Sequence, residues 1–290
     1  MSQPATPAAG TRAIVLGGGG VAGIAWELGV LSAFQDAGVD LDAADLVVGT
    51  SAGSVVGTLL RQGGIADAFA QQSAPAPTTY EEPARIDAEL VQQQIAQALA
   101  GATSEQDARA RLGHLAQQVT TGQTDDERVE TFTEMLPSSA WPERPLGVTA
   151  IDAVDGTFRV LTAADGIPLP RAVASSCSVP VVWSPVQIEG RPYIDGGMRS
   201  ATNADVAAGY ERVLVLACGP EAPSPLGPWL DQSVEALRAG GSSVEVVVAD
   251  SAAMQAFGTN SLALSTQRPS AEAGHAQGSA VAEGIAAFWA

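Results

Sequence analysis

The stretch AIVLGGGGVAGIAWELGVLSAF at residues 13–34 decides the fold class. Its first four residues form a short apolar run that is typical of a buried strand, and this run leads directly into Gly17–Gly20. From Ile24 to Phe34 the apolar residues recur at helical spacing, and Gly38 follows as a helix-ending signal. The stretch therefore predicts a strand, a glycine loop and a helix in succession.

The same order of elements returns at residues 46–64. Leu46-Val47-Val48 is a second apolar strand, Gly49-Thr50-Ser51-Ala52-Gly53 follows it, and a helical run continues through Leu60 to Gly63-Gly64. Two successive strand-to-helix units are typical of parallel sheets. The sequence therefore predicts an α/β protein with a mainly parallel central sheet.

The middle of the chain has a different composition. Residues 65–141 are rich in Gln, Ala and acidic residues and show no strand-like run, so we expect a helical insertion there. Within it, Thr124-Asp125-Asp126-Glu127 has the form of a capping box, which predicts a helix start.

Strand patterns return after the predicted insertion. We expect hairpins over residues 146–161, turning at Asp155-Gly156, and over residues 186–194, turning at Glu189-Gly190. A buried strand is predicted at Arg212–Ala217.

We expect the chain to form one domain over residues 12–290. This domain would follow a disordered tail at residues 1–11 and end in a helical region at about 226–290, since the spacing is helical from about Trp229 to Phe257 and again from Glu272 to Phe288.

Composition excludes several classes of function. The 290 residues contain 14 cationic side chains, all of them Arg, against 32 Asp and Glu, which gives a net charge of −18. This charge argues against nucleic-acid binding, because neutralising phosphates requires clustered cations. The absence of Lys excludes a Schiff-base lysine, a lysine nucleophile and a phosphate-binding P-loop lysine. With 46% hydrophobic residues the chain has enough apolar material for a core, so disorder of the whole chain is excluded.

Other features bear on the compartment. Cys177 and Cys218 are too few for a disulfide framework, and we expect both to be free thiols in a reducing compartment. Residues 1–12 show no secretory signal pattern, and no run approaches the roughly 18 to 20 apolar residues of a membrane span. We therefore expect a soluble, cytoplasmic protein. The Ala-rich, Lys-free composition is typical of a GC-rich bacterial genome.

Ser51 is the first candidate for chemistry. It is the centre of a Gly-x-Ser-x-Gly pattern between an apolar strand and an apolar helix, which is the context of a nucleophile elbow. Small residues flank such a serine because a side chain at Gly49 or Gly53 would clash at the sharp turn. The alternative is a helix-capping turn in which Thr50 or Ser51 is the N-cap.

The glycine loop allows two interpretations. Backbone N–H groups of Gly17–Gly20 are available at the start of a helix and could stabilise an anion. The pattern Gly18-x-Gly20-x-x-Gly23 also satisfies the dinucleotide fingerprint of an oxidoreductase. That fingerprint requires an acidic residue at the end of the second strand, whereas Asp40, Asp42 and Asp45 precede that strand, so the dinucleotide interpretation is disfavoured.

A serine nucleophile needs a base. The chain offers His114 in the predicted insertion and His275 in the C-terminal region, and both positions favour surface or packing roles. Asp195, which follows the strand Pro192-Tyr193-Ile194 and precedes Gly196 and Gly197, is the best-placed carboxylate. Taken alone, this segment also fits an ordinary Asx turn.

Together these motifs resemble the patatin-like phospholipases. That family pairs a Gly-Gly-Gly-x-Arg/Lys-Gly oxyanion loop with a Gly-x-Ser-x-Gly nucleophile and an Asp-Gly-Gly/Ala base. Residues 18–23 (GGGVAG), 49–53 (GTSAG) and 195–197 (DGG) match in this order, and residues 174–185 look like the stretch that precedes the family's aspartate strand. The resemblance covers about residues 12–217 except the insertion. It departs from the pattern at Ala22, where the family usually has Arg or Lys.

The resemblance implies a three-layer α/β/α fold and a serine acyl hydrolase acting on lipid esters, without a metal or organic cofactor. Its catalytic residues would be Ser51 and Asp195, as a dyad without histidine, and its oxyanion hole would be Gly18, Gly19 and Gly20. Because Ala22 carries no charge, backbone amides would stabilise the oxyanion. A catalytically silent lipid-binding or scaffold relative is the alternative outside enzymes.

The position of the predicted insertion and the charge of the chain bear on substrate access. The insertion follows the nucleophile helix, so its amphipathic helices would either cover an apolar acyl channel or form a helical layer without that role. A net charge of −18 and the lack of a basic amphipathic helix predict at most transient membrane contact, through apolar surface. The expected partner is a lipid or small ester substrate.

Overall fold

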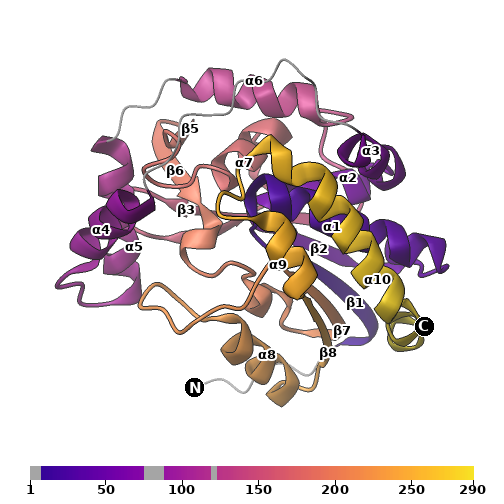
Figure 1. The fold of residues 1–290 in the computed structure, drawn as a ribbon. Coiled ribbons are helices and arrows are strands. Elements are labelled where there is room, and N and C mark those ends of the chain that lie inside the picture. Colours follow the sequence, from indigo (N-terminus) through magenta and orange to yellow (C-terminus); the bar gives the residue numbers. More distant parts are fainter. Residues whose placement is uncertain (1–7, 75–87, 119–122) are drawn as a thin grey trace.

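A computed structural model describes residues 8–74, 88–118 and 123–290 of the protein (Figure 1). Its centre is an eight-stranded sheet in the order β5-β6-β3-β2-β1-β7-β8, with β4 also paired to β3. The strands are β1 (Ala8–Leu16), β2 (Leu46–Gly49), β3 (Leu146–Asp152), β4 (Phe158–Leu161), β5 (Val186–Ile188), β6 (Arg191–Asp195), β7 (Tyr210–Ala217) and β8 (Ser243–Val248). β3, β2, β1, β7 and β8 run parallel, whereas β4, β5 and β6 join by antiparallel pairing. The predicted mainly parallel sheet is confirmed.

Helices cover both faces of the sheet (Figure 1). They are α1 (Gly20–Asp36), α2 (Ala52–Arg61), α3 (Ile65–Ser73), α4 (Ala88–Leu99), α5 (Glu105–Gln118), α6 (Asp125–Met135), α7 (Leu169–Ser176), α8 (Leu230–Ala239), α9 (Ser251–Phe257) and α10 (Gln267–Trp289). Short 3₁₀ helices are η1 (Leu41–Ala43), η2 (Ala163–Asp165), η3 (Gly196–Met198), η4 (Ala204–Ala207) and η5 (Leu264–Thr266).

β1 shows how the layers are formed. Ile14 and Leu16 point into the larger core, which also contains side chains of α1, α2 and α10. Ala13 and Val15, one residue out of phase, pack on the opposite face with side chains of α8. Since successive strand residues face opposite sides, a continuous apolar strand must be covered on both faces. This accounts for a three-layer arrangement.

The two predicted hairpins are present. β3 pairs with β4 and β5 pairs with β6, both antiparallel, with turns at the expected positions. Between α2 and β3 the described residues form α3 to α6 and no strand. The predicted capping box begins α6: the Thr124 hydroxyl accepts the Glu127 N–H, and the Glu127 carboxylate accepts the Thr124 N–H at 2.8 Å.

Two expectations from the sequence differ from the structure. The C-terminal region is not wholly helical, because Ser243–Val248 forms β8, paired in parallel with β7. The run of valines in this segment favours an extended strand, and pairing with β7 is what stabilises it. At the other end, β1 begins at Ala8, so residues 8–11 of the expected tail are ordered: the Ala8 N–H bonds to the Gly209 carbonyl. Residues 1–7 lie outside the described part.

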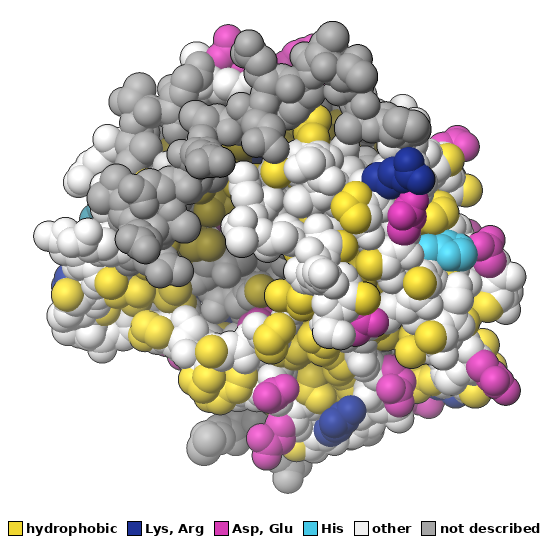
Figure 2. Space-filling model, in the orientation of Figure 1, with side chains coloured by type: hydrophobic (Ala, Val, Ile, Leu, Met, Phe, Trp, Pro, Cys, Tyr) yellow, Lys and Arg dark blue, Asp and Glu magenta, His cyan; other side chains and the backbone are white. Residues whose placement is uncertain are grey.

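Acidic side chains are spread over the face shown in Figure 2, with few arginines among them. This distribution agrees with the net charge of −18. In the described part of the chain, no helix combines the length and the apolar character that crossing a bilayer requires.

Candidate active site

Ser51 lies at the sharp turn between β2 and α2. Its backbone has φ +51° and ψ −115°, a conformation that a non-glycine residue adopts only under strain. The turn is tight enough that a Cβ on Gly53 would lie 2.1 Å from the Leu16 carbonyl oxygen. The Gly-x-Ser-x-Gly segment therefore has the geometry predicted for a nucleophile elbow, and a simple capping turn does not describe it, because the Ser51 side chain caps no N–H group.

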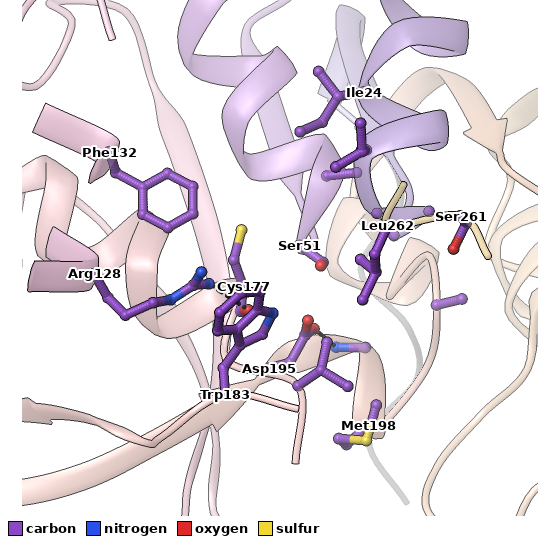
Figure 3. Close-up of a pocket in the computed structure, with 18 of the residues that line it drawn as sticks. Ile24, Ser51, Arg128, Phe132, Cys177, Trp183, Asp195, Met198, Ser261 and Leu262 are labelled. Carbon is purple, nitrogen blue, oxygen red and sulfur yellow. Dashed lines mark hydrogen bonds between the residues drawn. The ribbon is translucent and has the colours of Figure 1, made fainter. Parts of the chain in front are cut away.

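The register of the sheet brings Asp195 to Ser51. On β3, Val148 pairs with Gly49 at the end of β2, and Ala150 pairs with Asp195 at the end of β6. The carboxyl ends of these two strands therefore lie on opposite edges of β3, two residues apart along it. Figure 3 shows the Ser51 hydroxyl pointing towards the Asp195 carboxylate.

Burial controls the protonation of Asp195. The side chain is 1% exposed, and this burial raises the pKa of the carboxyl to about 7. Three groups oppose the rise in pKa: the Gly197 N–H, which donates to Oδ1 at 2.6 Å, the Ser51 hydroxyl and the charge of Arg128. A carboxylate with a pKa near neutrality is suited to accept and return a proton.

The glycine loop forms another side of the same site. Gly18 donates its N–H to the Ala201 carbonyl at 2.7 Å, so this amide is engaged within the protein. The N–H groups of Gly19 and Gly20 make no hydrogen bond to any other described residue, and both residues line the pocket. Of the three predicted oxyanion donors, Gly19 and Gly20 are therefore the better placed.

Ala52 adds a donor that the sequence reasoning missed. It is the first residue of α2, it lines the pocket, and no described residue accepts its N–H. The available signal was its position, because the residue after an elbow nucleophile commonly supplies one oxyanion donor.

Glu27 holds the start of the glycine loop through a hydrogen bond with Gly17, and the sequence reasoning also missed this residue. It is completely buried, and its Oε1 accepts the Gly17 N–H at 2.8 Å, whereas Oε2 has no partner among the described residues. Burial raises the pKa of this carboxyl well above its ordinary value. The sequence placed Glu27 within the predicted helix at residues 24–34 but gave no indication that it contacts the loop.

Cys218 packs on the other side of the loop. A Cβ on Gly19 would lie 2.5 Å from its Sγ and one on Gly23 would lie 2.9 Å away, which explains why glycines are needed at both positions. Gly196 has a similar constraint beside the dyad, because its Cβ would lie 2.3 Å from the Thr149 hydroxyl.

The site opens into a mostly apolar cavity of about 420 Å³. Ile24, Val179, Trp183, Met198 and Leu262 form much of its wall (Figure 3). Another part comes from one face of α6, with Arg128, Thr131, Phe132 and Met135 at positions i, i+3, i+4 and i+7. Of the described residues of the predicted insertion, those of α6 line the pocket.

Among the described residues, Arg128 is the one cation that lines this cavity. Its guanidinium lies 3.9 Å from the ring centre of Trp183 and 5.3 Å from that of Phe132, and Nη2 donates to the Cys177 carbonyl at 3.1 Å. Ala22, the position of the family's usual cation, is fully buried and is not part of the cavity wall. Sequence reasoning missed Arg128, whose helix begins more than 70 residues after Ser51.

The histidines lie elsewhere. His114 is exposed on α5, and His275 stacks on Phe69 and contacts the Asp36 carboxylate at 3.1 Å. Neither lines the cavity. The arrangement therefore offers Asp195 as the group beside Ser51 that can act as a base.

The described residues offer no metal site, and Asp45 is not placed to hold a nucleotide. Within the described ranges, no three His, Cys, Asp or Glu side chains form a group that could hold a metal ion. Asp45 lies just before β2 and its carboxylate accepts the Arg12 N–H, so it is not at the strand end where a dinucleotide's ribose would bind.

Comparison with known proteins shows which family this chain matches. The model of the patatin-like phospholipases matches residues 14–208. No curated protein sequence matches. Among solved structures, VipD from Legionella pneumophila is similar over 96% of this chain and 68% of its own, with 12% identity and a TM-score of 0.45. The type III effector protein ExoU is similar over 97% of this chain and 54% of its own, with 16% identity and a TM-score of 0.41. Since the family model spans about two thirds of the sequence and includes Ser51 and Asp195, the chain belongs to the patatin-like phospholipase family.

Proposed function

We propose that the protein is a lipid acyl hydrolase that cleaves carboxylic esters with Ser51 as nucleophile and Asp195 as base. The observation that carries this proposal is the strained Ser51 elbow beside a buried carboxylate, in a cavity whose wall contains no histidine. Family membership supports the same class of reaction.

The first half of the reaction forms an acyl-enzyme. Asp195 takes the proton of the Ser51 hydroxyl as its oxygen attacks the ester carbonyl. The negative charge that develops on the carbonyl oxygen is stabilised by the N–H groups of Gly19, Gly20 and Ala52, at the starts of α1 and α2, where the helix dipoles are favourable. When the intermediate collapses, Asp195 returns the proton to the leaving alcohol.

The second half releases the acid. Asp195 takes a proton from water, the resulting hydroxide attacks the acyl carbonyl, and the proton returns to Ser51 as the C–O bond to the enzyme breaks. The apolar cavity of about 420 Å³ suits the acyl chain, because apolar walls remove it from water.

A fluorophosphonate reaction tests the proposal directly. We expect the protein to gain one adduct in intact mass, and peptide mapping to place it on Ser51. Ser51→Ala abolishes the adduct, whereas Ser261→Ala, which removes the other serine of the cavity wall, leaves it. A protein that neither forms the adduct nor hydrolyses a short-chain ester would be the catalytically silent relative, and the proposal would be wrong.

A further inference from the structure

Arg128 is a buried cation that the reaction above does not use. Arg128 comes from α6 and is 7% exposed, yet within the described residues it forms no ion pair with a carboxylate. Its Nε is buried without a hydrogen-bond partner. Burying a charge in this way is unfavourable unless an opposite charge or further hydrogen bonds compensate it.

The aromatic contacts fix the orientation of the guanidinium. The guanidinium carbon lies 3.9 Å from the ring centre of Trp183 and 5.3 Å from that of Phe132, so both rings make cation–π contacts with the group. Contacts of this kind do not use the N–H donors at the edge of the guanidinium, which can still bind in its plane. Nη2 uses one of these for the Cys177 carbonyl, and Arg128 still lines the cavity. A planar fork of donors at a cavity wall matches the geometry of a phosphate or carboxylate.

The nearest negative charge does not serve as a permanent counterion. Arg128 interacts electrostatically with Asp195, but Asp195 becomes neutral each time it takes the serine proton. Cys177, the other group facing Arg128, is a buried thiol whose pKa is raised to about 12, so it is uncharged at neutral pH. Asp195 therefore serves as a counterion of Arg128 only while it is ionised, and Arg128 loses this counterion when Asp195 takes the serine proton.

Arg128 also lies on the side of Ser51 away from the glycine loop. In Figure 3, Arg128, Phe132 and Trp183 lie on one side of Ser51, and Leu262, which packs beside Gly20 of the glycine loop, lies on the other. This position argues against direct contact with the oxyanion and favours contact with a charged group elsewhere on the substrate.

We propose that Arg128 is a specificity-determining residue that binds the phosphate of a phosphodiester-bearing ester substrate. The inference rests on the proposed hydrolase function and adds to it a preference for anionic over neutral esters. In this chain a cation from α6 thus lines the cavity, while Ala22, at the position of the family's usual cation, is uncharged and buried away from the cavity.

A matched pair of substrates tests the assignment. One is a short-chain diacyl phosphatidylmethanol, and the other is the same diacylglycerol with a neutral methyl ether in place of the phosphate, both used below the concentration of micelle formation. Arg128→Met should lower the ratio of kcat/KM for the phosphate ester to that for the neutral ester by about 10- to 100-fold, as expected for loss of a buried charged hydrogen bond. Any effect of Arg128 on Asp195 acts on both esters and cancels in the ratio.

Two further variants keep the test interpretable. Arg128→Lys should recover part of the ratio, because it keeps the charge but loses the planar fork, and it covers the case in which Arg128→Met does not fold. Arg171→Gln is the control for displacement of α6: Arg171 pairs with Asp125 and Asp126 at the start of α6 but does not line the cavity. We expect it to keep the wild-type ratio.

The outcomes separate the two proposals. If the wild-type protein hydrolyses neither ester, the hydrolase function fails. If it hydrolyses both and Arg128→Met leaves the ratio unchanged, the role of Arg128 is overturned while the hydrolase stands. Inorganic phosphate should compete only weakly with the neutral ester. Tight competition that Arg128→Met abolishes would assign the site to a free anion and overturn the assignment to the substrate.

Discussion

The two walls of the cavity are formed under different constraints. On one wall, Ser51 and Asp195 stand at strand ends, and the neighbouring glycines leave no space for a side chain: even a single Cβ at Gly53 would contact the Leu16 carbonyl. On the other wall, α6 presents side chains such as Phe132 and the half-exposed Met135. Backbone geometry determines the first wall and side-chain packing the second. Side chains on the α6 wall can therefore change without disturbing the backbone of the fold, whereas side chains cannot be added at the glycines beside Ser51 and Asp195.

The largest expected effect is the loss of activity when Ser51 or Asp195 on the first wall is substituted. Ser51→Ala and Asp195→Asn should each lower kcat/KM for a short-chain ester by at least about a thousandfold, because one loses the nucleophile and the other cannot accept its proton. His114→Ala and His275→Ala are the controls and should stay within about threefold of wild type. If either histidine variant lost as much activity as Asp195→Asn, the Ser51–Asp195 dyad would be wrong and the catalytic group would be a triad that includes that histidine.

The next largest effect is the loss of folding stability expected when a side chain is added at Gly53, in the tight turn around Ser51. Gly53→Ala should lower the free energy of unfolding by about 3 kcal/mol or more, because the nearest atoms belong to the backbone of the central strand β1. Gly57→Ala, one turn later in α2, should change it by less than about 1 kcal/mol, since a Cβ there meets only side-chain ends at 3.0 Å and beyond. Met135→Ala on the α6 wall should have a similarly small effect. Urea denaturation measures all three, and equal losses for Gly53→Ala and Met135→Ala would contradict the comparison.

The pH dependence of kcat/KM measures the electrostatic interaction between Asp195 on the first wall and Arg128 on the second. Because Asp195 acts as a base and burial raises its pKa to about 7, kcat/KM for a neutral ester should rise as pH increases through about 7 and then level off. The charge of Arg128 lowers the pKa of Asp195, so Arg128→Met should move this inflection to higher pH. Arg171→Gln, outside the cavity, should leave it in place. An inflection near pH 4 in the wild type would mean that Asp195 is more hydrated than the structure indicates.

The smallest expected effect concerns the attachment of α6. Thr124→Ala removes the capping-box hydroxyl and should cost about 1 kcal/mol in local stability. Hydrogen exchange of the α6 amides should become faster, while exchange in β1 and β2 stays unchanged. KM should rise more than kcat falls, because the variant loosens a wall that binds substrate. Equal acceleration of exchange in β1 would show that the two walls unfold as one unit.

Much of the architecture was predictable from local patterns. Apolar runs beside glycines marked β1 and β2, the alternation around Asp155-Gly156 and Glu189-Gly190 marked two hairpins, and Thr124 with Glu127 marked the start of α6. The sequence analysis missed β8 because the local pattern of a short valine-rich segment between two helices does not separate a strand from a helix. Its pairing with β7 makes the segment a strand. The order at residues 8–11 also depends on β7, which lies about 200 residues away.

The motifs at Gly18–Gly23, Gly49–Gly53 and Asp195–Gly197 can be recognised from the amino-acid sequence, because tight turns and close backbone approaches restrict which residues fit. How these motifs are arranged around one cavity depends on the folded structure. The pairing of β2 and β6 with β3 brings Ser51 to Asp195, the Ala201 carbonyl occupies the Gly18 amide, and α6 carries Arg128 into the cavity. These outcomes depend on contacts between residues distant in the chain, which no local pattern records, and on burial, which raises the pKa of Asp195 and leaves Arg128 without a permanent counterion.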